Sequence, residues 1–332
     1  MLEALEDLAG QLAATCRRQQ LELETSELAR VASMGVGDTT FGVDTAPEQI
    51  VAQWAEAHAR RGPLSILTED TGWRHLGPAP GGFRELDSFD HGGPRVVVDP
   101  VDGSRNLMFD LRSAWAAIAS APPGPLQPRL RDLTLGVVQE LGTSRHGRAL
   151  RLVGTANGAC CEELFELTPG GLGTRLERRV LRADTEARVD GGFFPFFRYH
   201  PASRIELARI EAAFFERLEL HESAELRSVF DDQYISNAGQ LVLLAQGRYR
   251  MIADLRGRLV NTDGSPSVTS KPYDIAAAVV CARAAGALVE DPLGGPLDTP
   301  LDATSPVSFV GYANAATGAR LRPHLLATLT PC

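Results

Sequence analysis

Apolar positions return at helical spacing in several long segments of the chain. The first covers residues 1 to about 33, and a second runs from Pro47 to about Arg60, with the proline suited to a first helical turn. Later segments with the same periodicity are ARIEAAFFERLEL, ISNAGQLVLLAQG, YDIAAAVVCARAAG and ARLRPHLLATL. Gly286 is expected to end the helix that begins at YDIAAAV. The pattern therefore predicts helices at both ends of the chain and through its second half.

Short runs of β-branched and apolar residues lie between these segments and predict strands. They are LSILTED, RVVVD, SAWAAIASA, DLTLGVVQEL, RYRMIADL, ALVEDPLGG and SFVGYA. RVVVD is expected to end at Asp99-Pro100, because proline cannot continue a central strand. Residues 74–94 are rich in glycine and proline and are predicted to form an exposed loop.

Helices and strands interleave along the whole chain, which favours a layered α/β architecture. A chain of 332 residues can form one large domain or two fused lobes. We expect an N-terminal α+β lobe over 1–155 and a C-terminal α/β lobe over 156–332, with the boundary near 155–190.

Composition and charge limit the possible partners. The net charge of -9 argues against a nucleic-acid polymer, since phosphate backbones favour surplus lysine and arginine. The acidic, amphipathic N-terminus is unlike a secretory signal, and no segment approaches the roughly 18 consecutive apolar residues that a membrane span requires. The five cysteines are odd in number and lack metal-ligand spacing. We therefore expect a cytoplasmic protein with reduced thiols and no membrane partner.

The segment DPVDGSRN, residues 99–106, carries the most information about chemistry. Two carboxylates three residues apart follow a buried strand, and Gly103 permits a close approach of the backbone to a ligand. Hard divalent cations prefer oxygen ligands, so Asp99, Asp102 and the Val101 carbonyl are candidate metal ligands. If a helix begins near Ser104, its free N–H groups would face a bound phosphate. An Asp-Pro turn with an aspartate cap is the alternative, and the isolated motif does not decide between the two.

Other acids stand at the ends of apolar segments. Glu69 closes the strand LSILTED, Asp274 opens an alanine-rich helix, and Asp38 and Asp44 flank a Gly/Thr-rich loop. Each has a simpler explanation, as a solvated acid, a helix cap or a turn residue. Those explanations do not account for the presence of acids at the ends of the apolar elements in this order.

The ordered set of motifs resembles the inositol monophosphatase superfamily of magnesium-dependent, lithium-sensitive phosphatases. DPVDGSRN is similar to that family's Asp-Pro-Ile/Leu-Asp-Gly-Thr signature, LTED to its Gly-Glu-Glu motif and GDTTFGVD to its first motif. YDIAAAVVCARAAGALVEDPLGGPLD is similar to the C-terminal Trp-Asp-x-Ala-Ala-Gly signature and the segments after it. The likeness covers nearly the whole chain, and it implies a layered αβαβα sugar-phosphatase fold.

The resemblance also implies a role for each matching residue. Two or three Mg²⁺ ions would be bound by five residues, most of them in the N-terminal lobe: Glu69, Asp99, Val101 through its carbonyl, Asp102 and Asp274. The water that attacks phosphorus would be held and activated by Asp44, Glu69 and Ser104. The phosphate or the rest of the substrate would contact Gly103, Ser104, Ser236 and Asp254.

Several positions depart from the family pattern. No lysine precedes the first motif, Tyr273 replaces the usual tryptophan, and Arg250 stands where members that act on inositol phosphates tend to carry an acid. Extra residues lie between Asp254 and Asp274. None of these departures touches a candidate ligand, but they bear on the choice of substrate.

The expected activity is Mg²⁺-dependent hydrolysis of a small phosphorylated polyol or sugar, such as inositol 1-phosphate. Fructose 1,6-bisphosphate and a 3'-phosphonucleotide such as phosphoadenosine phosphate are alternative substrates. A non-catalytic relative that keeps the fold for binding is the rival from another class. Since members of the family are commonly dimers, the resemblance also implies a possible homodimer.

Overall fold

The computed structural model describes residues 1–34, 39–189, 191–199, 201–222, 228–259 and 269–330. Its α-helices are α1 (Leu2–Glu22), α2 (Thr25–Leu28), α3 (Gly42–Ala59), α4 (Ser104–Met108), α5 (Pro201–Glu222), α6 (Asn237–Ala245), α7 (Pro272–Ala285) and α8 (Ala315–Leu329). Its strands are β1 (Val31–Met34), β2 (Thr39–Phe41), β3 (Leu64–Thr68), β4 (Gly72–Ala79), β5 (Gly82–Glu85), β6 (Arg95–Asp102), β7 (Ala114–Ala121), β8 (Leu135–Leu141), β9 (Arg148–Thr155), β10 (Cys160–Thr168), β11 (Gly171–Leu181), β12 (Met251–Asp254), β13 (Leu288–Glu290) and β14 (Phe309–Tyr312). No described helix combines the length and the apolar composition that a membrane span requires.

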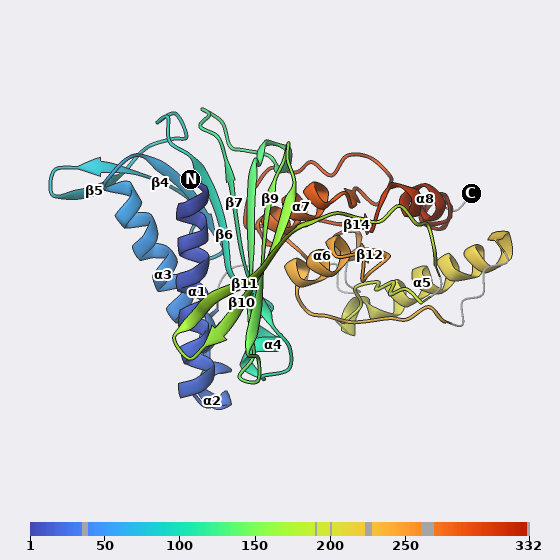
Figure 1. Cartoon of the computed structure of the whole chain (residues 1–332). Helices are drawn as coiled ribbons and strands as arrows, with labels where there is room; N and C mark the ends of the chain where they lie inside the picture. Colours follow the sequence, from blue (N-terminus) through green and yellow to red (C-terminus); the bar gives the residue numbers. More distant parts are fainter. Residues whose placement is uncertain (35–38, 190, 200, 223–227, 260–268, 331–332) are drawn as a thin grey trace.

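The elements stack in alternating layers of helix and sheet. Figure 1 shows α1 and α3 on one side of a large sheet, α6 and α7 on the other, then a small sheet containing β12 and β14, and finally α5 and α8. The small sheet has the order β12-β14-β13 and is antiparallel. The layering confirms the predicted αβαβα architecture.

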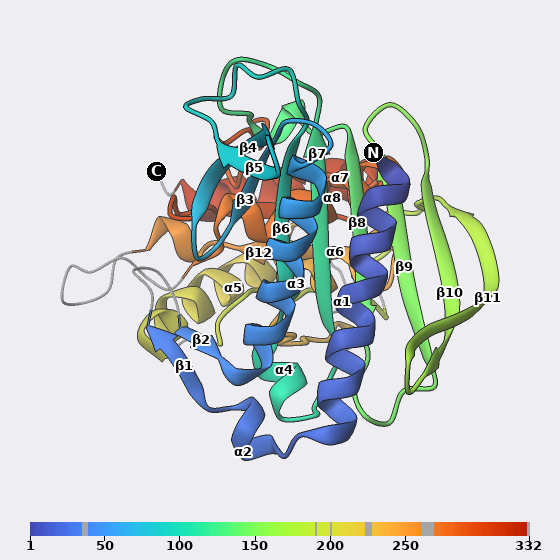
Figure 2. The same ribbon diagram turned by 90° about the vertical axis from the view of Figure 1, so that its left-hand side faces the viewer.

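The large sheet has the order β11-β10-β9-β8-β7-β6-β3-β4-β5. Only the β3–β6 pair within it is parallel among the described strands. α1 and α3 lie side by side across one face, as Figure 2 shows. Because helices cover both faces of its centre, the central strands read as continuous apolar runs rather than alternating ones.

Residues of one central strand divide between two hydrophobic cores. On β6, Val96 and Val98 pack in the core beneath α1 and α3, whereas Val97 packs in the core beneath α6 and α7. On β7, Ile118 and Trp115 are divided in the same way. Successive side chains of a strand point to opposite faces, so both layers are anchored by the same strands.

Three sequence predictions about the N-terminal half are wrong. The first helix ends at Glu22 rather than near residue 33, and α2 and β1 follow it. Residues 74–94 are not a plain loop, because the β4–β5 hairpin occupies most of their first half. Strand β6 also continues through Pro100 to Asp102, since an irregularity in its pairing with β7 accommodates the proline.

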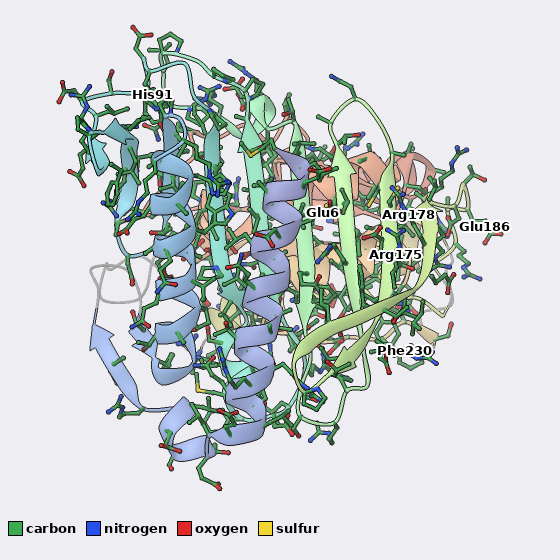
Figure 3. All side chains as sticks on the ribbon, turned by 60° about the vertical axis from the view of Figure 1, so that its left-hand side comes forward. Glu6, His91, Arg175, Arg178, Glu186 and Phe230 are labelled. Carbon is green, nitrogen blue, oxygen red and sulfur yellow. The ribbon has the colours of Figure 1, made fainter. Side chains whose placement is uncertain are left out.

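Apolar periodicity did not reveal β10 and β11, the two strands at one edge of the large sheet. β10 and β11 form a long hairpin, and β11 is exposed along most of its length, with arginine and glutamate in place of an apolar face. Figure 3 shows Arg175 and Arg178 on this outer strand. The sheet therefore continues past residue 155, and the proposed division into two lobes stays a prediction.

A directed chain of hydrogen bonds joins three segments at the β3–β4 end of the sheet. The Gly93 N–H donates to His91 Nδ1 (3.0 Å), so the neutral His91 ring carries its proton on Nε2. Ser65 Oγ lies 2.7 Å from both His91 Nε2 and His75 Nδ1. The proton count requires His91 to donate to Ser65, and Ser65 to donate to His75. His91 itself lies beside the β4–β5 hairpin (Figure 3).

We expect this chain to make stability depend on pH. Burial lowers the pKa of both His75 and His91. Charge repulsion from His91 lowers the pKa of His75 further. A histidine whose folded pKa lies below its unfolded value stabilises the fold above the unfolded pKa of about 6.5, and that stability falls as pH drops through the folded pKa. Relative to the His75→Gln/His91→Gln variant, the original protein should therefore lose free energy of unfolding in urea as the pH falls from 7.5 to 5.5. An equal pH dependence in both proteins would contradict this assignment.

Candidate metal centre

Two buried aspartates stand at the end of β6. Asp99 and Asp102 are each 8% exposed. Asp99 pairs in register with Ala117 and Asp102 with Trp115, so β6 has one residue more than β7 between these two pairs. Residues three apart on a regular strand point to opposite faces. The extra residue in this bulge allows both carboxylates to face the same region.

The turn after Asp102 depends on a glycine. Gly103 has φ +96°, a left-handed conformation, and it precedes the short helix α4. A Cβ at this position would lie 3.0 Å from the Ile235 carbonyl oxygen and 3.1 Å from Ser236 Cβ. Asn106 ties the same turn to the segment before α6 by donating to the Ile235 carbonyl (2.6 Å).

Gly103→Ala is expected to destabilise the protein by about 1–3 kcal/mol, because the left-handed backbone and the crowding of Ser236 both add strain. The measurement is urea-induced unfolding. Gly81→Ala is the matched control, since Gly81 also has positive φ but a Cβ added there would have no heavy atom within 4 Å. A loss no larger than that of the control would show that the approach to Ser236 contributes nothing.

Asp102 is held by the N-terminus of α6. Its Oδ2 accepts from Ser236 Oγ (2.6 Å) and the Ala238 N–H (2.6 Å), and its Oδ1 accepts from the Asn237 N–H (3.2 Å). Ser236 also caps α6 by accepting from the Gly239 N–H (2.9 Å). These donors favour a carboxylate, yet burial dominates and raises the pKa of Asp102 to about 6.

Ser104 connects α4 to the first turn of α3. Its hydroxyl donates to Asp44 Oδ1 (2.6 Å) and also lies 3.0 Å from the Val101 carbonyl oxygen. The other Asp44 oxygen accepts from the Phe41 N–H (2.9 Å) and so caps α3. Asp44 and Ser104 are therefore brought together, as the resemblance implies, while Asp38 lies outside the described residues.

Asp274 and Glu69 complete the acidic surroundings of Asp99. Burial raises the pKa of Asp99 well above its usual range, and the charges of Asp102, Asp274 and Glu69 raise it further. Burial likewise raises the pKa of Asp274 to about 7, although the Lys271 N–H donates to its Oδ2 (2.7 Å). Asp274 itself is half-buried.

Glu48 is an acid of this region that the sequence analysis missed. It lies one turn after Asp44 on α3, and burial raises its pKa to about 8, with further contributions from Asp70, Glu69 and Asp44. Residues four apart on a helix share a face, so the i, i+4 spacing to Asp44 was the available signal.

The acids lie around Asp99, but they are not arranged as the complete ligand set of an ion. In the part of the chain that is described, no three His, Cys, Asp or Glu side chains are grouped as ligands of a single ion. Asp102, Asp274 and Asp44 instead accept hydrogen bonds from backbone N–H groups and hydroxyls. Two cavities lie elsewhere, one between α1, α2 and α3 and one beside α6.

The donor chemistry nevertheless fits a hard divalent cation. All five candidate ligands offer oxygen, four as carboxylates and one as the Val101 carbonyl, and Mg²⁺ prefers such donors. Mutual repulsion among buried acids is costly, and a cation between them would relieve it. The burial of Asp99 and Asp102, each 8% exposed at the end of one strand, supports this fit, and the charges of Asp102, Asp274 and Glu69 add to the effect of burial in raising the pKa of Asp99.

Two predicted substrate contacts have other partners. Ser236 is committed to Asp102, as described above. Asp254 is completely buried and forms a bidentate pair with Arg256, with Nε–Oδ1 at 2.8 Å and Nη2–Oδ2 at 2.7 Å. Arg250 is 2% exposed and pairs with Asp184 (2.7 Å), so it packs inside the C-terminal layers. The extra residues after Asp254 fall largely in 260–268, outside the described residues.

Comparisons with known proteins identify the fold. No protein-family model matches the sequence, and no curated protein matches it. Among solved structures, the extragenic suppressor protein SuhB of Bartonella henselae shares 16% identity with a TM-score of 0.64, over 98% of this chain and 97% of that chain. A protein described as an inositol monophosphatase-fructose 1,6-bisphosphatase shares 15% identity with a TM-score of 0.64, over 97% of this chain and 98% of that chain.

A third similar structure is the inositol monophosphatase of Anabaena (Nostoc), with 18% identity and a TM-score of 0.56, over 99% of this chain and 96% of that chain. Near-complete coverage of both chains in each case means that the whole architecture is shared, rather than one motif. At this level of identity the likeness establishes the fold and leaves the activity to be argued from the site. The chain has the fold of the inositol monophosphatases.

Proposed function

We propose that the protein is a Mg²⁺-dependent phosphomonoesterase that acts on a small phosphorylated polyol or sugar. The observation that carries the proposal is a pair of buried aspartates, Asp99 and Asp102, beside the α4 turn, with Asp274 and Glu69 close enough for their charges to raise the pKa of Asp99, inside an inositol monophosphatase-like fold. Asp99, Asp102, Asp274, Glu69 and the Val101 carbonyl would hold the ions. When bound, the ions supply an activated water and neutralise charge on the transferring phosphoryl group.

Asp44 and Ser104 would position the attacking water. Asp44 Oδ1 and the Val101 carbonyl oxygen can only accept, so the single Ser104 hydrogen goes to one of them and the Ser104 oxygen keeps the capacity to accept. It can therefore accept a hydrogen bond from a water and turn an oxygen lone pair of that water toward phosphorus. The reaction leaves little covalent chemistry to the protein, so orientation and electrostatics supply most of the rate.

The start of α4 would receive the phosphate. Within the described residues, neither the Gly103 nor the Ser104 N–H donates to an acceptor of the chain itself. Gly103 leaves this approach open because it has no side chain. Asp254 has a different role in this proposal, since its carboxylate is enclosed and paired with Arg256.

The decisive experiment measures phosphate release from a panel of esters with and without Mg²⁺. The panel contains inositol 1-phosphate, fructose 1,6-bisphosphate, phosphoadenosine phosphate and an aryl phosphate. The bisphosphate is included because the printed description of one structural neighbour names both activities. Magnesium-dependent release is the expected result. No release from any ester, together with no detectable Mg²⁺ binding, would favour a non-catalytic relative.

Magnesium should also raise the thermal unfolding temperature. A ligand that binds only the folded state stabilises it by mass action, by about 2.7 kcal/mol at one hundred times its dissociation constant. Differential scanning calorimetry with Mg²⁺, with EDTA and with neither would measure the effect. Identical unfolding temperatures in all three conditions would count against the site.

A further inference from the structure

One basic residue at the candidate metal centre differs in kind from every other in the chain. The chain has 33 lysine and arginine residues, and Lys271 is the only lysine among them. It stands directly before α7, three residues before Asp274. A lysine presents a compact point charge on a flexible stem, whereas an arginine presents a planar fork of donors. The chain therefore uses this kind of charge once, and it does so beside a candidate metal ligand.

The backbone and the side chain of Lys271 act separately on Asp274. The Lys271 N–H donates to Asp274 Oδ2 (2.7 Å), which fixes the start of α7 at the carboxylate. The charge of the side chain lowers the pKa of Asp274 and so opposes the effect of burial, which places the ammonium group within electrostatic reach of the acid. Lys271 is half-buried, and no residue in the described part of the chain forms an ion pair or a hydrogen bond with its ammonium group.

The neighbouring cation, Arg256, is already committed. Its guanidinium binds both oxygens of Asp254 and also Ser270 Oγ (2.9 Å), and the ring of Tyr199 lies over it, with its centre at 4.7 Å. Arg256 is 2% exposed as a result. Because Ser270 directly precedes Lys271, both cations border the same turn. An anion that reaches this turn therefore meets Lys271 rather than Arg256.

The phosphate that is hydrolysed has other partners in the proposed function. It is received by the start of α4 and by the ions, which neutralise charge on the transferring phosphoryl group. Lys271 instead stands before α7, beside Asp274. An ammonium group that is partly withdrawn from water is costly without a partner, and a second anionic group on the same ester would relieve that cost. A neutral hydroxyl would relieve it less, since charge-assisted hydrogen bonds are the stronger ones.

We propose that Lys271 binds a second anionic group of the substrate, so that the protein prefers phosphate esters that carry a further phosphate or carboxylate over monophosphates of uncharged polyols. This role rests on the proposed phosphatase function and defines the substrate class of the same site. Lys271 contacts the substrate away from the reacting atoms and determines specificity.

Pairs of esters that differ in one anionic group test the preference. Fructose 1-phosphate is compared with fructose 1,6-bisphosphate, and glycerol 3-phosphate with 3-phosphoglycerate, each with Mg²⁺. We expect kcat/KM to be higher by about tenfold or more for the doubly anionic member of at least one pair, as one charge-assisted hydrogen bond implies. The pair that shows the preference identifies the second group as phosphate or carboxylate.

Lys271→Met should abolish this preference. It should lower kcat/KM for the doubly anionic ester by about tenfold or more, mainly through KM, and change that of the monophosphate by less than about twofold. Lys271→Arg, which keeps the charge, should retain more of the preference than Lys271→Met. Arg61→Met is the matched control, because Arg61 is exposed beyond the end of α3 and its loss should leave the preference unchanged. Circular dichroism and urea unfolding verify the fold of each variant.

The single lysine also permits a test that does not depend on turnover. Reductive methylation with ¹³C-formaldehyde keeps the charge of the amine and labels only Lys271 and the α-amino group, and Lys271→Met identifies which resonance belongs to Lys271. The ligands are phosphonate analogues of the fructose pair, in which carbon replaces the ester oxygen. With Mg²⁺ present, the Lys271 resonance should shift with the doubly anionic analogue and much less with the singly anionic one.

The outcomes separate this inference from the proposed function. Equal losses for both members of each pair in Lys271→Met, or equal shifts with both phosphonates, would show that Lys271 contacts the phosphate that is hydrolysed and would overturn the inference while the phosphatase activity stands. Hydrolysis without any preference would overturn it in the same way. No hydrolysis of any ester, together with no shift, would overturn both. No hydrolysis together with a selective shift would refute the phosphatase activity and leave Lys271 as an anion-binding residue.

Discussion

Asp102→Asn is expected to reduce magnesium-dependent phosphate release by at least about a hundredfold while the protein remains folded. The substitution removes one negative charge from the group of acids around Asp99. It also replaces one oxygen with an amide nitrogen, which cannot ligate a cation through a lone pair. The Ser236 hydroxyl and the α6 N–H groups now donate to both Asp102 oxygens, so the amide nitrogen would lose at least one of these bonds.

Two measurements separate a lost ligand from a damaged fold. Without Mg²⁺, the variant should unfold at a temperature close to that of the original protein, because relief of charge repulsion offsets the lost hydrogen bond. With Mg²⁺, only the original protein should gain stability. Asp87→Asn is the matched control, since Asp87 is exposed in the loop before β6 and carries the same charge. Undiminished turnover in Asp102→Asn would exclude Asp102 as an essential residue.

The sequence predicted well those elements that bury apolar residues, either in a continuous run or at helical spacing. α6, α7 and α8, and the strands β3, β6, β7 and β8, lie close to the positions that apolar spacing indicated. Periodicity failed for β11, because that strand is exposed on most positions and carries paired charges instead of an apolar face. It also failed for β4 and β5, where glycine and proline suggested a loop but the turn between them joins two paired strands.

The candidate site shows the same division between local and long-range information. Asp99, Asp102 and Gly103 belong to one turn, and their sequence pattern was sufficient to single them out. The donors to Asp102 come from residues more than 130 positions away, and the Ser104–Asp44 bond spans 60 positions. Such contacts follow from the stacking of layers and have no signature in local spacing. The resemblance to a known family indicated the Asp44–Ser104 contact, but it assigned Ser236 to the substrate rather than to Asp102.

Asp254 illustrates a residue whose chemistry suggested substrate binding but whose surroundings indicate another role. It has no exposed surface, and Ser270 Oγ lies 2.5 Å from its Oδ2 and 2.9 Å from Asn237 Oδ1. The backbone N–H of Asn237 in turn donates to Asp102. Asp254 therefore anchors Arg256 and helps to fix the N-terminus of α6, which makes it a positioning residue in the proposed reaction.

Asp254→Leu is expected to destabilise the protein by about 3–5 kcal/mol, because it leaves the Arg256 guanidinium buried without its carboxylate partner. Arg256 is 2% exposed, and its guanidinium lies 4.7 Å from the centre of the Tyr199 ring, so it has little access to water. Arg74→Met is the matched control. It breaks an exposed pair with Glu85, and such pairs contribute about 0–1 kcal/mol.

The double variant Asp254→Leu/Arg256→Met distinguishes a lost attraction from an uncompensated charge. If the loss of the Asp254 carboxylate opposite the buried Arg256 charge causes the destabilisation, removal of both charges should restore part of the stability, and the double variant should be more stable in urea than Asp254→Leu alone. If Asp254 acts mainly through Ser270 and Asn237, the double variant should be no more stable than the single one. In that case the hydrogen bonds that reach α6, rather than the ion pair, would be what holds Asp102 in place.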